Sequence, residues 1–160
     1  MKRRYIFFSA LLLLSAIIVY VFYPTDKNRI RKVIGNCEEA VVAEDIDKLM
    51  KFISYNYRDE YGNGYLKLKK TLQTVFRRLD SIYIERNIKG ISVNDKLAEA
   101  ELSIRVLVSR PGGSPVATEN DEKRYIIGDA GNSRTIKVFF EKTSYKWLIT
   151  KVDGVFDVKN

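Results

Sequence analysis

The spacing of apolar residues changes near residue 81, from the period of a helix to the period of a strand. Before this point apolar side chains recur at every third or fourth position, which is typical of helices that bury one face. After it they alternate with polar side chains, and β-branched residues become more frequent. Helices followed by strands indicate one α+β domain, in which three helices pack on one face of a curved antiparallel sheet of about four to six strands.

The first two helices are expected on either side of the sequence "AED" at residues 43–45. Thr25 and Asp26 offer a start for the first helix, and Asp45 can cap the second. We interpret Cys37, the only cysteine, as a small buried apolar residue, because no adjacent base would activate it as a reactive thiol. It lies in the apolar stripe of the first helix, with Ile30, Val33, Ile34, Ala40 and Val41.

The third helix is expected over residues 65–80 and has two contrasting faces. One face is apolar and is expected in the core. The other face is basic, and such a face is either only solvated or docks on anionic lipid headgroups or an acidic partner. The apolar residues are Tyr65, Leu68, Leu72, Val75, Phe76 and Leu79, and the basic ones are Lys67, Lys70, Arg77 and Arg78.

The clearest strand pattern covers residues 98–109. We expect its apolar side chains to face the helices, with Leu102, Ile104 and Phe76 buried between the sheet and the third helix. A strand is also expected around residues 82–88, before a turn at residues 93–96, and others near residues 123–128, 134–142 and 146–153. The Gly- and Pro-containing residues 110–121 are expected to form a loop.

The uncharged run "YIFFSALLLLSAIIVYVFY" over residues 5–23 predicts a transmembrane helix. As a helix it would be about 28 Å long, close to a hydrocarbon core of about 30 Å. A cleaved signal peptide is the alternative, but its apolar part is usually shorter and ends in a small-x-small site. We therefore expect a single-pass anchor over residues 1–24 and a domain over residues 25–160.

The orientation of this anchor follows from its flanks. Lys2, Arg3 and Arg4 favour a cytoplasmic N-terminus, although the bases at residues 27–32 nearly balance them. Because long domains are translocated largely regardless of their charge, we expect the domain on the extracytoplasmic side, periplasmic or on the outer face.

Composition excludes several kinds of site. The chain has no histidine, which excludes histidine-based triads, general bases and metal ligands. Its net charge of +8 includes three bases before the apolar run, and the remaining excess is a weak signal for nucleic acid, which we do not expect as a partner. No phosphate-binding or calcium-binding loop pattern is present in the sequence, so we expect no cofactor and no metal.

The order of the expected elements resembles the nuclear transport factor 2-like superfamily, also called SnoaL-like. The resemblance rests on the first helix, the "AED" break, the junction "YRDEYGNG" at residues 57–64 and the long alternating strands, and covers about residues 26–153. It implies a cystatin-like cone with a pocket between helices and sheet. Members of this superfamily include isomerases and dehydratases, and others that only bind a ligand or a partner, some of them tethered to membranes in secretion and envelope machines.

The junction between the second and third helices holds the candidate pocket or loop residues Tyr57, Asp59 and Tyr61. In a catalytic interpretation, Asp59 is a base beside the phenol of Tyr57 or Tyr61, a pattern that resembles ketosteroid isomerase. In a structural interpretation, the nearby glycines take backbone angles that other residues avoid, and Asp59 or Asn63 caps the third helix. We favour the structural interpretation and assign no catalytic residue.

We therefore expect a membrane-anchored extracytoplasmic binding or assembly-scaffold module without catalytic activity. Its expected partners are the membrane, through residues 5–23, and a protein partner or a second copy on the exposed sheet face. A small apolar ligand is a further expectation. The alternative is a small-molecule isomerase or lyase that uses an Asp/Tyr pocket in the same cone, although the dehydratases that the chain resembles often use a histidine.

Overall fold

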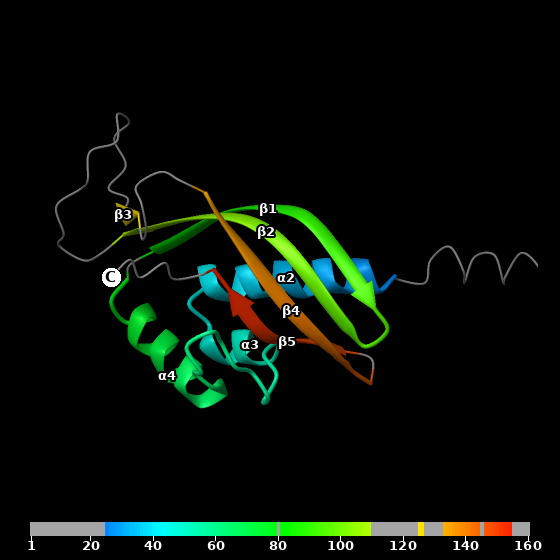
Figure 1. The fold of residues 1–160 in the computed structure, drawn as a ribbon. Coiled ribbons are helices and arrows are strands. Elements are labelled where there is room, and N and C mark those ends of the chain that lie inside the picture. The colour runs from blue at the N-terminus through cyan, green and yellow to red at the C-terminus, as the bar shows by residue number, and fades with distance from the viewer. Residues whose placement is uncertain (1–24, 80, 110–124, 127–132, 145, 155–160) are drawn as a thin grey trace, which may run out of the picture.

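The computed structural model describes residues 25–79, 81–109, 125–126, 133–144 and 146–154 (Figure 1). Helices come first and strands follow, and every paired strand is antiparallel. The strand order is β1-β2-β4-β5, with β3 beside β2. The expected α+β fold is therefore confirmed. The elements are α2 (Asp26–Val42), α3 (Ile46–Met50), α4 (Tyr65–Phe76), β1 (Ser81–Asn94), β2 (Leu97–Ser109), β3 (Tyr125–Ile126), β4 (Arg134–Thr143) and β5 (Lys146–Asp153).

Two expectations fall on other parts of the chain. The anchor expected over residues 1–24 and the loop expected over residues 110–121 lie outside the described residues. Among the helices that are described, none combines the length and the apolar character that a membrane span needs.

The first two helices begin at the predicted caps. The Thr25 hydroxyl accepts a hydrogen bond from the backbone N–H of Asn28 at 3.3 Å, and the Asp45 carboxylate accepts one from the N–H of Lys48 at 2.8 Å. Between them, Glu44 has a positive φ of 55°, which turns the chain after α2. The predicted break at residues 43–45 is confirmed.

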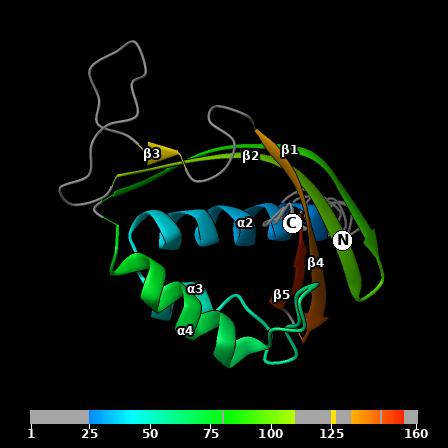
Figure 2. The same cartoon turned by 60° about the vertical axis from the view of Figure 1, so that its left-hand side comes forward.

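The sheet bends around α2, which lies directly against its concave face (Figure 2). β1 and β2 form a long hairpin that closes at Asp95 and Lys96, and the pairing register shifts at a bulge between Ile88 and Gly90. At the other side, the backbone of residues 52–58 pairs with β5, because Ser54 N–H donates to the Ile149 carbonyl at 2.8 Å. This segment covers an edge that would otherwise be open to another chain.

The helices form layers instead of packing side by side on the sheet. α3 lies against α2, and the backbone of α4 approaches only α3 among the described elements. Leu102 is therefore buried against α2, in a cluster with Ile30 and Ile34, whereas Phe76 belongs to a second cluster with Ala40. The expectation that these residues meet between the sheet and the third helix is wrong for Leu102, because α2 occupies that place, whereas Phe76 does pack with Ile82 and Val108 of the sheet.

The third helix is also shorter than expected. It ends at Phe76 instead of continuing to residue 80. A tight turn follows, in which the Leu79 N–H donates to the Phe76 carbonyl at 3.2 Å and the Leu79 side chain packs in the core. Phe76 is the only residue of α4 that is buried. Leu66 is 78% exposed and Val75 36% exposed, so α4 is the outermost layer.

Candidate functional site

The junction that carries the candidate residues connects α3 to α4. Its first part runs along β5, where the Arg58 N–H donates to the Thr150 carbonyl at 3.0 Å. Its second part is a tight loop over residues 59–63, in which Gly62 has a φ of +75°. This angle favours glycine, as expected. Gly64, by contrast, is extended at φ −88° and ψ 179°, so the expectation of a special angle there is wrong.

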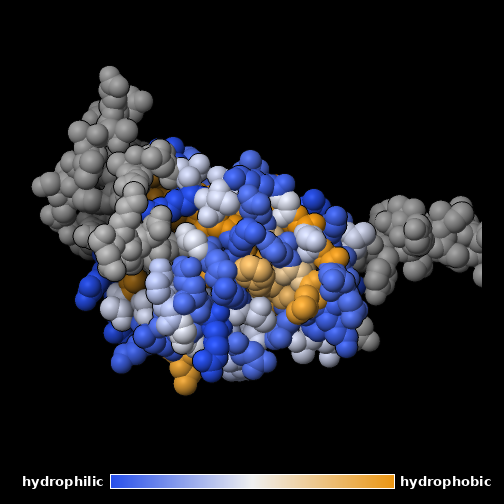
Figure 3. Space-filling view, viewed as in Figure 1, coloured by the Kyte–Doolittle hydropathy of each residue, from blue (hydrophilic) through white to orange (hydrophobic). Residues whose placement is uncertain are grey.

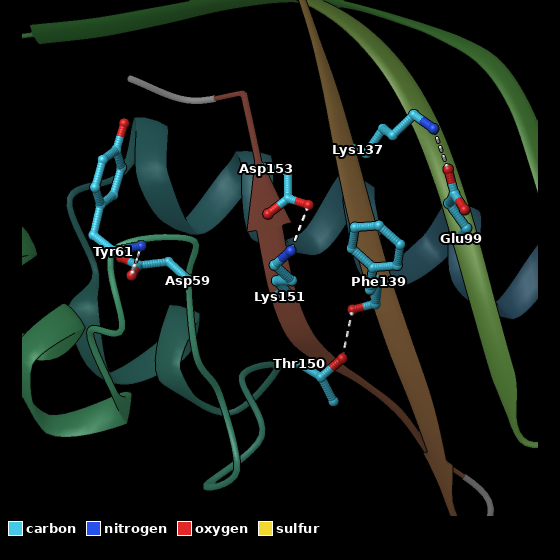
Figure 4. Close-up of polar contacts among 8 residues, drawn as sticks. All are labelled: Asp59, Tyr61, Glu99, Lys137, Phe139, Thr150, Lys151 and Asp153. Carbon is cyan, nitrogen blue, oxygen red and sulfur yellow. Dashed lines mark hydrogen bonds and ion pairs between the residues drawn. The ribbon is translucent and has the colours of Figure 1, made fainter. Parts of the chain in front are cut away.

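Asp59 holds this loop together. Its Oδ1 accepts a hydrogen bond from the backbone N–H of Tyr61 at 2.9 Å (Figure 4). The same oxygen accepts one from the backbone N–H of Asn63 at 2.7 Å, and Oδ2 accepts one from the Asn63 side-chain amide at 2.7 Å. These bonds form an Asx turn, which closes the loop upon itself. Neither Asp59 nor Asn63 caps α4, because Gly64 occupies the cap position without a side-chain hydrogen bond. The predicted helix cap is therefore wrong. Asp59 has a structural role, but as the acceptor of an Asx turn and not as a helix cap.

Tyr57 belongs to the core. It is 4% exposed and packs in the same cluster as Met50 and Ile53. Burial raises the pKa of its phenol to about 12, and the negative charges of Asp59 and Asp153 add to this effect. At neutral pH the phenol is uncharged, so it can donate a hydrogen bond but cannot act as a base.

Tyr61 and the surface around the loop complete the predicted set. Tyr61 is 53% exposed, and its ring points away from the Asp59 carboxylate (Figure 4). A shallow depression of about 420 Å³ lies beside the loop. Of the three candidate residues, only Tyr57 lines this depression, together with Tyr55, Asn56, Arg58, Gly62 and Gly64. The structure thus does not bring the three predicted residues together on one pocket.

Large side chains fill the concave side of the sheet. Trp147 is 2% exposed, Phe140 1% and Ile30 0%, and all three belong to one cluster. The Trp147 indole N–H donates to Asp26 Oδ1 at 3.1 Å, and Lys142 Nζ donates to Asp26 Oδ2 at 2.8 Å. These bonds lower the pKa of Asp26, with the Lys142 bond as the larger cause. They fix the start of α2 to the β4–β5 hairpin.

The outward face of the sheet carries apolar side chains that we name the outer patch: Leu97, Phe139 and Leu148. Leu97 is 65% exposed, and the other two are half-buried. Leu97 and Leu148 lie on either side of Glu141 in the register of β2, β4 and β5. Phe139 stands two residues from Glu141 on β4, so it shares the same face. Figure 3 shows apolar surface among hydrophilic residues in this region.

Charged residues around the outer patch are paired with one another. Lys137 bonds to Glu99 at 2.9 Å and Lys151 to Asp153 at 2.7 Å (Figure 4). The Lys151 ammonium also lies 5.5 Å from the centre of the Phe139 ring. The sequence analysis expected a partner on the exposed sheet face but did not identify these residues, although the doublet Phe139–Phe140 was a signal, since strict alternation places only one of the two in the core.

Two further findings concern the chemistry of the site. Among the described residues, no group of three or more histidine, cysteine, aspartate or glutamate side chains is placed to hold a metal ion.

Cys37 is partly buried at the junction of both core clusters, and burial raises the pKa of its thiol to about 12. This placement agrees with its interpretation as a small apolar residue.

Comparisons with known proteins support the fold. No protein-family model and no curated protein sequence matches the chain. Among solved structures, the chain is similar to a proposed scytalone dehydratase from Novosphingobium aromaticivorans, with 13% identity and a TM-score of 0.65 over 79% of this chain and 80% of that chain.

Two further structures show the same likeness. One is a nuclear transport factor 2-like protein of unknown function from Shewanella oneidensis, with 16% identity and a TM-score of 0.55 over 80% of this chain and 97% of that chain. The other is a domain of unknown function with a cystatin-like fold from Nostoc punctiforme, with 18% identity and a TM-score of 0.57 over 79% and 74%. At such identities the likeness establishes the cone fold that the resemblance implied, and no shared activity.

Proposed function

We propose that this chain is a membrane-anchored extracytoplasmic module that binds a protein partner on the outward face of its sheet and catalyses no reaction itself. The observation that carries the proposal is the outer patch, where exposed Leu97 stands beside half-buried Phe139 and Leu148. Exposed apolar surface with a polar rim is typical of interaction sites between proteins.

The charges at the rim favour a protein partner over a polyanion. Lys137 and Lys151 are each held by a carboxylate, and Lys89 lies 3.4 Å from Glu101. A face whose lysines are neutralised by neighbours attracts a nucleic acid weakly. It can however meet another apolar surface at a small desolvation cost, because the ion pairs remain exposed to water at the rim.

The anchor part of the proposal rests on the sequence. The uncharged residues 5–23 end just before Thr25, which caps α2, so the domain follows the expected span with almost no linker. A domain held this close to a membrane meets the proteins of that membrane repeatedly, because tethering raises the effective concentration of any partner in the same membrane.

The alternative function is a small-molecule isomerase or lyase in the same cone. The likeness to a proposed scytalone dehydratase favours it. The geometry favours it less, because both oxygens of Asp59 already accept hydrogen bonds from the loop. The concave side is also filled by Trp147 and Phe140, so a ligand in the cone would have to displace well-packed side chains.

A photocrosslinker in the full-length chain tests the proposal. The amino acid p-benzoylphenylalanine replaces Phe139 in one variant and Tyr55 in the other, since Tyr55 is 84% exposed and lines the loop depression. After irradiation of intact cells, we expect a discrete adduct from position 139 and none from position 55. The mass of the adduct then tells whether the partner is another protein or a second 18.5 kDa chain.

The opposite result would contradict the proposal. An adduct from position 55 alone would place the binding site at the loop depression. Conversion of a small molecule by the purified full chain, lost in Asp59→Asn, would establish the isomerase or lyase alternative.

A further inference from the structure

Three segments meet at the end of the domain where the described chain begins. The Asp26 carboxylate bonds to Lys142 Nζ at 2.8 Å and so joins the start of α2 to the end of β4. The backbone N–H of Lys142 donates to the Lys96 carbonyl at 2.8 Å, which joins the β4–β5 hairpin to the β1–β2 turn. Figures 1 and 2 both place the start of α2 beside the β1–β2 hairpin.

Exposed lysines gather at this end, which we name the entry end. Lys27 follows Asp26 in the first turn of α2, Lys96 lies in the β1–β2 turn, and Lys146 pairs with Thr143 at the start of β5. All three lysines are exposed. Asp26 is neutralised by Lys142, and the other nearby carboxylates are Asp95 and Glu141, the latter bonded to the Ser54 hydroxyl. The entry end therefore carries a positive excess.

We propose that the entry end lies against the anionic headgroups of the membrane that holds residues 5–23. This inference rests on the proposed anchor. The chain passes from the expected span into α2 through residues 24–25, so the entry end is the part of the domain that must lie nearest to the bilayer. Each lysine near an anionic surface shifts the docking equilibrium by about fivefold.

The basic face of α4 is the competing surface, and its position argues against it. Lys67 and Lys70 are exposed on α4, which belongs to the layer farthest from the sheet and lies away from the start of α2 (Figure 2). A domain tethered at residue 25 cannot bring α4 to the same membrane as readily. Docking through the entry end leaves the outward sheet face free for a partner.

A fluorescent probe on the full-length chain tests this orientation. In a Cys37→Ala background, the exposed residue Thr143 at the entry end and the exposed residue Thr71 on α4 are each replaced by cysteine and labelled with bimane. The chain is reconstituted into vesicles that contain headgroup-spin-labelled lipid, either in phosphatidylcholine alone or with about 30% phosphatidylglycerol. Flotation of the vesicles reports anchoring separately from quenching.

We expect strong quenching at position 143 in the anionic vesicles, weaker quenching there in phosphatidylcholine, and little at position 71 in either. Reversal of the entry-end charges by Lys27→Glu, Lys96→Glu and Lys146→Glu abolishes the difference at position 143. The matched control, with Lys67→Glu and Lys70→Glu on α4 and Arg77→Glu at its C-cap, leaves the quenching difference at position 143 unchanged.

The results that overturn the inference differ from those that overturn the anchor. Chains that fail to float with the vesicles contradict both. Chains that float but show equal quenching at positions 143 and 71, or quenching at 143 that does not depend on phosphatidylglycerol, contradict the docking alone.

Discussion

Asp59 is the residue on which the catalytic and structural interpretations diverge. Its oxygens accept three hydrogen bonds from Tyr61 and Asn63. In Asp59→Asn the Oδ1 acceptor of both backbone N–H groups is kept and only the bond from the Asn63 side-chain amide is lost, so we expect a smaller loss of unfolding free energy than in Asp59→Ala. In Asp59→Ala the loop N–H groups lose their acceptor, and we expect a loss of about 0.5–2 kcal/mol. Chemical denaturation of the full chain in detergent micelles measures both, and equal losses would contradict the Asx turn.

Asp26 is expected to make the stability of the domain depend on pH in the acid range. Hydrogen bonds from Lys142 and Trp147 lower its pKa in the folded state. Its contribution to stability is therefore present above the ordinary carboxyl pKa and is lost as the pH falls through the lower, folded value. We expect the free energy of unfolding to fall more steeply below about pH 4 in the parent chain than in Asp26→Asn. Parallel slopes in the two proteins would contradict this assignment.

Residue patterns predicted some of these roles and not others. Thr25 and Asp45 were identified as caps because a cap depends on neighbours within three residues. Asp59 was not identified as a loop acceptor, because the same residue type before a glycine suits either an Asx turn or a helix cap.

At the scale of elements, β2 offers a test of the sheet's inward face. Leu102 is 4% exposed in the main cluster, so Leu102→Ala is expected to cost about 2–5 kcal/mol of unfolding free energy. Ile104 is only partly buried, so Ile104→Ala is expected to cost less unfolding free energy than Leu102→Ala. Ser103→Ala, on the opposite face, is the control and is expected within about 0.5 kcal/mol of the parent. A larger loss in Ser103→Ala would mean that the register is wrong.

The start of α4 can be improved because it lacks a side-chain cap. Gly64 is extended, and the nearest atom to an added Cβ is the Tyr57 carbonyl oxygen at 3.8 Å. Gly64→Ser is therefore expected to raise the melting temperature, by a gain of about 0.3–1 kcal/mol. Gly62→Ser is the matched control, since its φ of +75° strains any other residue, and it is expected to lower the melting temperature. A shift of the melting temperature in the same direction in both variants would contradict these backbone angles.

The period of the apolar residues predicted the elements well, but not how they pack. Strands β1, β2, β4 and β5 fall where alternation placed them. The layering of α3 and α4 behind α2 could not be predicted, because an amphipathic pattern says which face is buried and not against what. α4 ends at Phe76, and the tight turn that follows it brings Leu79 into the second cluster.

At the scale of the whole molecule, the sequence predicted the cone and an exposed sheet face for a partner, but not which residues of that face form the outer patch. The outer patch arises only when β2, β4 and β5 are in register, which places Leu97 and Leu148 on either side of Glu141. Residues so far apart in the sequence give no local signal. The predicted site at residues 57–61, in contrast, was conspicuous in the sequence because it combines tyrosine, aspartate and glycine, and the structure uses those residues for core packing and a loop.

The membrane-anchored, extracytoplasmic placement in the proposed function depends on the orientation of residues 5–23. The most direct test fuses alkaline phosphatase, which folds only after export to an oxidising compartment, behind Asn160 of the full chain in a bacterial host. The account predicts an active enzyme that stays with the membrane after alkaline washing, and loss of both properties when Leu12 and Leu13 in the run are replaced by arginine. An inactive fusion that stays in the membrane, or an active one released with a shortened N-terminus, would contradict the account.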